Sequence, residues 1–354
     1  MNSEIGSYYN ININTNIKRL LNTDTDVKFY TSGRVALKDI LSKLNKINKC
    51  NIELIIPNYI CESLYDVFKI YNTKTYEIDN SLNLNINSIE KYLNENNEIQ
   101  RILYVIYYFG YIDTHMSKIK KLCNENNIII IDDFTHNMYI KDDELYGDIS
   151  LCSFRKSLPT PFGSILKINN KRILNKLENI TCERLNKSEF TEFFKYLFVN
   201  FIRLTGMCLK NFNYIKPIWR QLLTYSELYI DKINYKNHDI INNMFYKLSN
   251  DYRYKAKRIK NFEYLNNNIK IKTFDKFKNT YFTYPIMFEN KTERDHYKNE
   301  LIKNQIYCVI YWPQSFNKTY VENKFIEKHI LCIPIDQRYT IKDMERIVTI
   351  FNNI

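Results

Sequence analysis

Short apolar runs alternate with stretches of helical spacing over residues 27–168, and this alternation constrains the fold more than any other feature. Residues 62–70 and 117–126 place apolar side chains at helical intervals. The apolar runs that predict buried strands cover residues 52–56, 102–107, 128–131 and 163–168. Strands without polar alternation, separated by helices, are typical of βαβ units around a mostly parallel sheet. The pattern therefore predicts a doubly wound α/β domain.

The rest of the chain has a different pattern. Long helical stretches over residues 172–265, with few turn signals beyond Gly206 and Pro217, predict helices that leave the sheet and join two domains. Shorter elements follow, with Thr340 as the expected N-cap of the last helix. They are predicted as strands at residues 281–288, 307–312 and 330–333 and helices at residues 294–304 and 341–352.

The length and composition fit a globular protein with two domains. At 354 residues the chain can bury a large core, and its 45% hydrophobic and 25% charged residues are ordinary for globular proteins. We expect a large α/β domain over residues 1–250, connecting helices included, and a small C-terminal α+β domain over residues 251–354. The formal net charge is +12, but the lysines are scattered among Asn, Ile and Tyr, which argues against a nucleic-acid surface.

The cysteines and the apolar runs bear on metal binding and location. The 8 cysteines contain no Cys-x-x-Cys pair, which argues against a zinc site or a disulfide framework and for thiols in a reducing compartment. Residues 1–16 show no secretory signal, and no apolar run approaches the roughly 20 residues of a membrane span. We therefore expect a cytoplasmic protein that binds neither a metal nor a membrane.

Two carboxylates and a histidine follow one of the predicted strands. Residues 128–131 are four isoleucines, and Asp132, Asp133 and His136 come soon after them. Ligands of open parallel sheets bind at the carboxyl ends of the strands, so acids at this position are candidates for a functional site. An isolated aspartate at a strand end is more often a loop cap.

A lysine follows a later predicted strand, as the two carboxylates follow the strand at residues 128–131. Residues 147–152 predict a short strand, and Ser153, Arg155 and Lys156 follow it before a loop that contains proline. Lys156 lies 23 residues beyond Asp133, which fits one loop and one strand between neighbouring strand ends. A lone lysine is usually a solvated surface residue, so the interest of Lys156 depends on the strand-end acids.

A turn built on Ser32 and Gly33 opens a helix near the start of the chain. The amides and the positive dipole end of such a helix start suit a phosphate, although Ser-Gly is also an ordinary N-cap. A phosphate cup, a strand-end aspartate and a later lysine, in this order, are what pyridoxal phosphate (PLP) requires. Asp133 would keep the pyridine nitrogen protonated, and Lys156 would form a Schiff base with the cofactor and later move a proton.

The order of these segments resembles the DegT/DnrJ/StrS family of fold-type I PLP enzymes, best known as nucleotide-sugar aminotransferases. The resemblance spans nearly the whole chain. It includes the Arg-Lys-x-Leu-Pro motif of a side branch of the family. It rests on residues 6–9, 32–37, 57–61, 108–110, 132–136, 153–159, 311–313 and 333–339. It implies a large PLP-binding domain whose mostly parallel central sheet is flanked by helices.

The resemblance also implies roles for individual residues. Lys156 would be the Schiff-base lysine, and Asp133 would be the partner of the pyridine nitrogen. His136 would lie near the ring and support Asp133 or the cofactor hydroxyl. The phosphate would be held by the backbone of Gly33 and Arg34 and by the hydroxyl of Ser153.

Two departures from the family pattern leave alternatives open. Cys61 occupies the position where many members stack an aromatic ring on the cofactor, so either Cys61 packs there or Tyr59 takes its place. The Gly-x-Asn-x-Arg stretch that usually follows the lysine is not visible after Gly163.

Three further residues are substrate candidates, each with an ordinary alternative. Arg338 could bind the carboxylate of an amino donor, or it could be a surface arginine. Trp312 could line a cleft between domains or belong to the core. Arg155 could contact substrate or phosphate, or it could pair with Asp148.

Three functions fit these features. The first is an aminotransferase that moves an amino group from a donor such as glutamate to a keto-sugar nucleotide, in surface-polysaccharide or secondary-metabolite biosynthesis. Retention of Lys156 favours it over related dehydratases, which carry histidine at that position. The second is a PLP enzyme of the same fold that acts on a small amino or keto acid, and the third is a non-enzymatic protein with this fold. The resemblance implies a homodimer.

Overall fold

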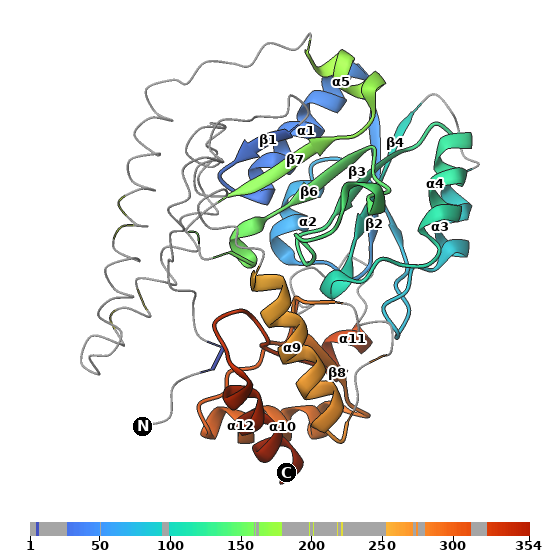
Figure 1. Cartoon of the computed structure of the whole chain (residues 1–354). Coiled ribbons are helices and arrows are strands. Elements are labelled where there is room, and N and C mark those ends of the chain that lie inside the picture. Colours follow the sequence, from blue (N-terminus) through green and yellow to red (C-terminus); the bar gives the residue numbers. More distant parts are fainter. Residues whose placement is uncertain are drawn as a thin grey trace. The chain divides into compact units, whose positions relative to one another are not determined.

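In the computed structural model the chain divides into two compact units. Figure 1 shows the helices and strands of the chain. The first unit contains Met1–Tyr8, Asn45–Cys152 and Asp251–Ile354, and the second contains Tyr9–Leu44 and Ser153–Asn250. The residues that the structure describes are 5–6, 27–49, 51–93, 99–158, 160, 163–178, 198, 201, 218, 221, 253–271, 274, 280–312 and 324–354.

Some sequence predictions concern residues outside these ranges. The connecting helices expected between residues 179 and 252, with their turn signals at Gly206 and Pro217, lie almost entirely outside them. The domain boundary expected at residue 250 also lies outside the described residues and stays a prediction. The same holds for parts of the quoted motifs and for three cysteines, namely residues 7–9, Pro159, Pro313, Cys50, Cys182 and Cys208.

Five parallel strands form the larger sheet region of the first unit. They are β2 (Ile52–Pro57), β3 (Asn72–Tyr76), β4 (Gln100–Ile106), β5 (Ile129–Asp133) and β6 (Ile149–Cys152). Their order is β6-β5-β4-β2-β3, and every neighbouring pair runs parallel. All residues of β2 and β6 are buried, and β4 and β5 are buried after their first residue. Burial on both faces explains why these strands are continuous apolar runs.

The edge strand β3 has no apolar run. It pairs on one side only, with β2, and its residues are exposed or half-buried up to Tyr76. A strand of this kind is held by the hydrogen bonds of one neighbour, so its sequence Asn-Thr-Lys-Thr-Tyr lacks the signal that marks the buried strands. The apolar pattern predicts the strands at residues 52–56, 102–107, 128–131 and 163–168, but it does not predict β3.

Amphipathic helices connect these strands. They are α2 (Glu62–Phe68), α3 (Ile86–Leu93) and α4 (Met116–Glu125). Each buries apolar side chains at helical spacing, as Met116, Ile119 and Cys123 do in α4. Helices α3 and α4 lie side by side (Figure 1). The helices predicted at residues 62–70 and 117–126 are confirmed, and α3 is an additional one.

The second unit contains an antiparallel strand pair and two helices. Strand β1 (Val27–Tyr30) pairs with β7 (Ser164–Ile168), with Tyr30 opposite Ser164. Helix α1 (Gly33–Ile47) begins soon after β1, and α5 (Lys171–Glu178) packs against β7. The parallel strands of the first unit, with helices between them, confirm the predicted α/β class.

The C-terminal part of the first unit is a small α+β arrangement. It contains α9 (Arg253–Asn268), β8 (Tyr284–Met287), α10 (Lys291–Lys303), α11 (Lys324–His329), β9 (Ile330–Ile333) and α12 (Ile341–Asn352). Strands β8 and β9 are antiparallel, and α9 and α10 both pack against α12. Thr340 at the N-cap of α12 forms a capping box with Asp343, whose carboxylate accepts from the N–H and hydroxyl of Thr340 at 2.8 and 2.9 Å. None of the helices within the described ranges has the length and apolar character needed to cross a membrane.

The prediction of a strand at residues 307–312 is wrong. The described structure has only isolated bridges nearby, Ile5 with Ile306 and Val309 with Cys332. Trp312 has a φ angle of 53°, in the left-handed region that bulky residues rarely adopt and that a β-strand does not contain. Tyr311 and Trp312 at the end of this segment pack in an aromatic cluster around His136 instead of forming a regular strand.

Candidate active site

The predicted site residues fall into two groups, one in each unit. Asp133, His136, Tyr59, Cys61, Trp312 and Arg338 belong to the first unit, and Gly33, Arg34, Ser153, Arg155 and Lys156 belong to the second. Among the described residues, no group of three or more His, Cys, Asp or Glu side chains could hold a metal ion.

The two adjacent aspartates at the end of β5 have different surroundings. Successive side chains of a strand point to opposite faces, which separates Asp132 from Asp133. Asp132 is fully buried and accepts hydrogen bonds from the hydroxyl of Tyr107 at 2.7 Å and from the N–H groups of Gly147 and Tyr146 at 2.7 and 3.1 Å. Burial raises the pKa of Asp132, and these hydrogen bonds oppose the rise. Asp132 therefore anchors the turn that leads into β6.

Asp133 keeps acceptor capacity for a further partner. Its Oδ2 accepts from the hydroxyl of Tyr104 at 2.8 Å, and its Oδ1 accepts from the N–H of Thr135 at 2.9 Å. Burial, followed by the charge of Asp133, raises the pKa of Tyr104 well above its usual value, so the phenol stays protonated and donates. A carboxylate has about four lone-pair positions. Two well-placed donors thus orient Asp133 without using all of its oxygens' capacity.

His136 accepts a hydrogen bond from the backbone. The N–H of Phe109 donates to His136 Nδ1 at 3.2 Å, so Nδ1 carries no proton and a neutral ring has its proton on Nε2. The backbone supports this geometry, with left-handed φ angles of 53° at Phe109 and 97° at Gly110. A Cβ atom at Gly110 would lie 2.7 Å from the carbonyl oxygen of His136, so only glycine fits there.

Aromatic rings enclose His136. The ring of Phe282 stacks on it with centroids 4.0 Å apart and planes 13° apart. Trp312 and Phe109 also stack on it, at 5.5 and 5.8 Å, and Tyr311 lies at 5.7 Å. Only 4% of His136 is exposed. Trp312 therefore contributes to the aromatic cluster around His136.

Tyr59 and Cys61, the alternatives for the ring-stacking position, have different environments. Tyr59 is fully buried, its hydroxyl donates to the carbonyl of Tyr311 at 2.7 Å, and its ring packs against Trp312 at 5.2 Å. Cys61 is half-buried at the N-cap of α2, with its sulfur 2.8 Å from the hydroxyl of Ser63. The Tyr59 side chain is thus enclosed by the aromatic cluster, whereas Cys61 is accessible.

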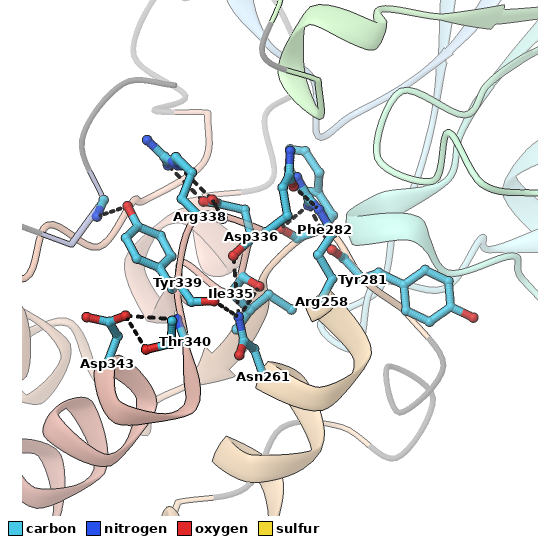
Figure 2. A network of polar contacts seen from close by, with 12 residues as sticks. Arg258, Asn261, Tyr281, Phe282, Ile335, Asp336, Arg338, Tyr339, Thr340 and Asp343 are labelled. Atoms are coloured by element: carbon cyan, nitrogen blue, oxygen red, sulfur yellow. Dashed lines mark hydrogen bonds and ion pairs between the residues drawn. The ribbon is translucent and has the colours of Figure 1, made fainter. Parts of the chain in front are cut away.

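Arg338 already binds a carboxylate. Its Nε and Nη2 donate to the two oxygens of Asp336 at 2.7 and 2.8 Å, and its guanidinium lies 5.0 Å from the ring centre of Tyr339 (Figure 2). This is the two-point geometry by which arginine recognises carboxylates. Any substrate carboxylate at Arg338 would share or replace this interaction.

In the second unit, Gly33 and Ser153 form a narrow cradle at the start of α1. Ser32 caps the helix, because its hydroxyl accepts from the N–H of Val35 at 3.3 Å. The N–H groups of Gly33 and Arg34 lie in the first turn of α1, at the positive end of the helix dipole. A Cβ atom at Gly33 would lie 3.4 Å from Cβ of Ser153, so a larger residue would narrow the space between them. The cradle has the donors and positive dipole end that a phosphate needs.

The turn that carries Lys156 is fixed by packing. This 3₁₀ turn, η4 (Phe154–Lys156), follows directly after β6, and its Phe154 ring is fully buried. The ring occupies the space where a Cβ of Gly163 would lie, 1.9 Å from the nearest ring atom. Gly163 has a φ angle of 128° and donates its N–H to the carbonyl of Thr31 at 2.8 Å. The turn can therefore shift little.

The Lys156 side chain is exposed, and within the described ranges no hydrogen bond or ion pair involves it. Arg155 is half-buried, and its N–H lies 3.5 Å from the carbonyl oxygen of Gly163. Asp148 forms an ion pair with Lys120 at 2.8 Å. A phosphate cradle, an accessible amine and an oriented carboxylate are groups that fit the phosphate, the aldehyde and the ring nitrogen of PLP.

Sequence reasoning missed several residues of these groups. Tyr104 lies inside the apolar run of β4, where nothing in the sequence distinguishes its hydroxyl from the core around it. Phe109 is part of the quoted Tyr-Phe-Gly motif, but its left-handed backbone is visible only in the structure. Phe282 and Tyr311 lie far along the chain from His136, so local patterns do not connect them.

Comparisons with known proteins identify the fold. No protein-family profile and no curated protein sequence matches the chain. The structure is similar to PseC of Helicobacter pylori, an aminotransferase involved in the biosynthesis of pseudoaminic acid, with a TM-score of 0.63 and 12% identity over 92% of this chain and 86% of that one. It is also similar to Spr1654 of Streptococcus pneumoniae, a putative sugar aminotransferase in its PMP form, with a TM-score of 0.61 and 11% identity over 92% and 87%.

A third similar structure belongs to an enzyme with a different reaction. It is a point mutant of ColD, a GDP-4-keto-6-deoxymannose-3-dehydratase with bound GDP-perosamine, with a TM-score of 0.60 and 12% identity over 92% of this chain and 88% of that one. The fold thus accommodates both transamination and dehydration, and the reaction must be argued from the site. The chain has the fold of the fold-type I PLP aminotransferases, as its sequence predicts.

Proposed function

We propose that this chain is a PLP-dependent aminotransferase that moves an amino group from an amino acid such as glutamate to a keto-sugar nucleotide. The observation that carries the proposal is the Lys156 amine, exposed and without a side-chain partner among the described residues, on a turn that Phe154 and Gly163 hold in place. An amine that no ion pair occupies is the nucleophile that carbonyl cofactors require. The fold, the cradle at Gly33 and the Asp133 carboxylate support the same cofactor.

Each group of residues would hold one part of PLP. The amides of Gly33 and Arg34 and the hydroxyl of Ser153 would donate to the phosphate, aided by the dipole of α1. Asp133 would accept a hydrogen bond from the protonated pyridine nitrogen. When bound, PLP supplies an electron-withdrawing ring that weakens the bonds at the α-carbon of an amino acid.

The protein's own groups then orient the reactants and move protons. Lys156 Nζ would take the proton from the α-carbon of the donor and deliver it to the cofactor carbon that carried the aldehyde, and it would move a proton in the opposite direction when the acceptor is aminated. Tyr104 and the N–H of Thr135 hold Asp133 in one orientation. His136, with its proton on Nε2, donates to Asp133 or to the cofactor hydroxyl.

A nucleotide-sugar acceptor is supported by the similar structures and by Lys156. One similar structure is described as a putative sugar aminotransferase, and the ColD structure holds a nucleotide sugar. A lysine at position 156 favours transamination over dehydration, because the dehydratases of this resemblance carry histidine there. We further propose that the enzyme works as a cytoplasmic homodimer in surface-polysaccharide or secondary-metabolite biosynthesis.

Titration of the purified protein with PLP, followed by absorbance, tests the cofactor. We expect an absorption band near the visible range that Lys156→Ala removes. Lys171→Ala is the matched control, since Lys171 is also an exposed lysine, at the start of α5. The absence of a band, or a band that Lys156→Ala leaves unchanged, would overturn the enzymatic proposal and favour a non-enzymatic protein with this fold.

Half-reactions test the substrates. The holoenzyme is first treated with glutamate, and the return of the PLP spectrum is then followed after addition of keto-sugar nucleotides or small keto acids. We expect a keto-sugar nucleotide to restore the spectrum. If small keto acids restore it and no nucleotide sugar does, the chain acts on a small amino or keto acid instead.

A further inference from the structure

A buried arginine connects the C-terminal segment to the residues that surround His136. Arg258 on α9 is 1% exposed, and its Nε donates to the side-chain oxygen of Gln337 at 2.7 Å. Its Nη1 donates to the carbonyl oxygens of Tyr281 and Phe282 at 2.9 and 3.4 Å (Figure 2). One guanidinium thus holds two segments that are more than fifty residues apart in the chain.

Phe282 transmits this restraint to the site. Its backbone carbonyl is bound by Arg258, and its ring stacks on His136 with centroids 4.0 Å apart. The Nδ1 edge of His136 accepts from the N–H of Phe109. The imidazole is therefore restrained on one face by Phe282 and on one edge by a backbone amide. A shift of Phe282 would remove the first restraint.

Asn261, one turn further along α9, provides an internal comparison. It is 2% exposed, and its side-chain amide donates to the carbonyls of Ile335, Asp336 and Tyr339 at 3.0, 3.3 and 3.2 Å. Residues three apart share one face of a helix. Within the described residues, Asn261 holds the same C-terminal loop as Arg258 but makes no hydrogen bond to the carbonyl of Phe282 (Figure 2).

We propose that Arg258 is a positioning residue for His136 and acts through Phe282. The inference rests on the proposed function, because it assigns His136 to the cofactor site. The planar fork of an arginine suits this task, since it reaches Gln337 and both carbonyls at once. A lysine at this position has one point charge and cannot reproduce all three hydrogen bonds.

Histidine NMR on the cofactor-free protein tests the proposal directly. The chain has 5 histidines, and the His136→Gln variant identifies the His136 signals. We expect Arg258→Gln and Arg258→Lys to shift the ring signals of His136, and Asn261→Ala to leave them in place. The unfolding midpoint of each variant is measured alongside, because both residues are buried and both substitutions weaken the C-terminal loop.

PLP binding and turnover provide the second readout. Displacement of a site group by about 1 Å can cost on the order of 100-fold in rate. We expect Arg258→Lys to slow the half-reaction with glutamate by about 10- to 100-fold, and Asn261→Ala to leave its rate within about twofold of wild type. Phe282→Leu, which keeps Arg258 but removes the stacked ring, should reproduce the Arg258→Lys spectrum and rate.

The outcomes separate this inference from the proposed function. Equal shifts of the His136 signals in the Asn261 and Arg258 variants would show a general loss of structure and overturn the positioning role. Unchanged His136 signals in a folded Arg258 variant would overturn it as well. If Arg258→Gln fails to fold, Arg258→Lys and Phe282→Leu decide the question. A wild-type protein that binds no PLP would contradict the proposed function, while the NMR comparison would still test Arg258.

Discussion

Gly163 and Gly33 differ in how much space their surroundings leave for a side chain. A Cβ at Gly163 would enter the ring of Phe154, and its φ angle of 128° disfavours any side chain. A Cβ at Gly33 would only approach Cβ of Ser153 at 3.4 Å. The first glycine maintains the turn that carries Lys156, and the second leaves space beside Ser153 where we propose that the phosphate binds.

Alanine at each glycine should therefore have a different effect. We expect Gly163→Ala to lower the free energy of unfolding by about 3 kcal/mol, because overpacking and backbone strain add. We expect Gly33→Ala to change it by less than about 1 kcal/mol, since alanine favours a helix, but to weaken PLP binding by about tenfold. Urea unfolding and PLP titration measure the two effects. Similar stability losses in both variants would contradict this distinction.

The candidate site residues differ in how clearly the sequence marks them. Asp133, His136 and Lys156 stand out because each follows a strand that the apolar pattern predicts. Arg258 and Phe282 do not stand out, since an arginine or a phenylalanine in a helical or mixed stretch has many ordinary explanations. Their contacts with Gln337 and His136 depend on how distant segments pack. Candidate reactive residues can thus be proposed from the sequence, whereas the residues that pack around them cannot.

At the scale of elements, Asp132 connects β5 to the turn before β6. Burial raises the pKa of Asp132 above the unfolded value of about 3.9, and hydrogen bonds from Ser150, Tyr107 and Gly147 oppose the rise. A carboxyl group with a raised folded pKa binds its proton more tightly in the folded state. Its contribution to stability is complete below the unfolded pKa and is lost as pH rises through the folded pKa.

The Asp132→Asn variant should lack this pH dependence of stability. Asparagine keeps an acceptor oxygen for Tyr107 and Gly147 but does not titrate. We expect the stability of the wild type, relative to Asp132→Asn, to fall as pH increases from about 4 through the folded pKa of Asp132. Unfolding free energies from urea titrations at several pH values provide the measurement. A difference that grows with pH would show that hydrogen bonding outweighs burial at this carboxylate.

The elements that sequence reasoning predicted and missed differ in burial. Strands β2, β4 and β5 were predictable because both of their faces are buried, which requires continuous apolar runs. Strand β3 has one strand neighbour and a mostly polar sequence, so the signal is lacking. Residues 307–312 have the apolar composition of a strand, but the left-handed backbone at Trp312 ends any regular pairing. The apolar composition of a segment thus predicts whether the segment is buried better than it predicts whether its backbone pairs in a sheet.

At the scale of the whole molecule, PLP binding should stabilise the folded chain. A ligand present at 100 times its Kd stabilises the folded state by about 2.7 kcal/mol if the unfolded chain does not bind it. We expect PLP to raise the Tm of the wild type more than pyridoxine phosphate does, because the latter lacks the aldehyde that reacts with Lys156. In Lys156→Ala the two compounds should act alike. Equal effects of the two compounds on the wild type would contradict the role of Lys156.

The order of motifs along the chain predicted the whole fold better than any single motif did. The phosphate cup, the strand-end acids and the lysine occur in the sequence order of the resemblance, and the strand order agrees with an α/β sheet of this class. Strand β1 was not predicted from the sequence, and the apolar run at residues 163–168 does not specify whether its strand, β7, pairs in parallel or antiparallel. The antiparallel pairing of β1 with β7 is therefore information that only the structure provides.

If Arg338 binds the carboxylate of an amino donor, as the sequence predicts, its ion pair with Asp336 affects which donors bind. With both oxygens of Asp336 on its guanidinium, Arg338 has an intramolecular competitor that is always present at high local concentration. A small monocarboxylate would have to displace this competitor with a single charge. A donor that also contacts other groups could compete through its additional binding energy. Asp336 would thus prevent weakly binding carboxylates from occupying Arg338.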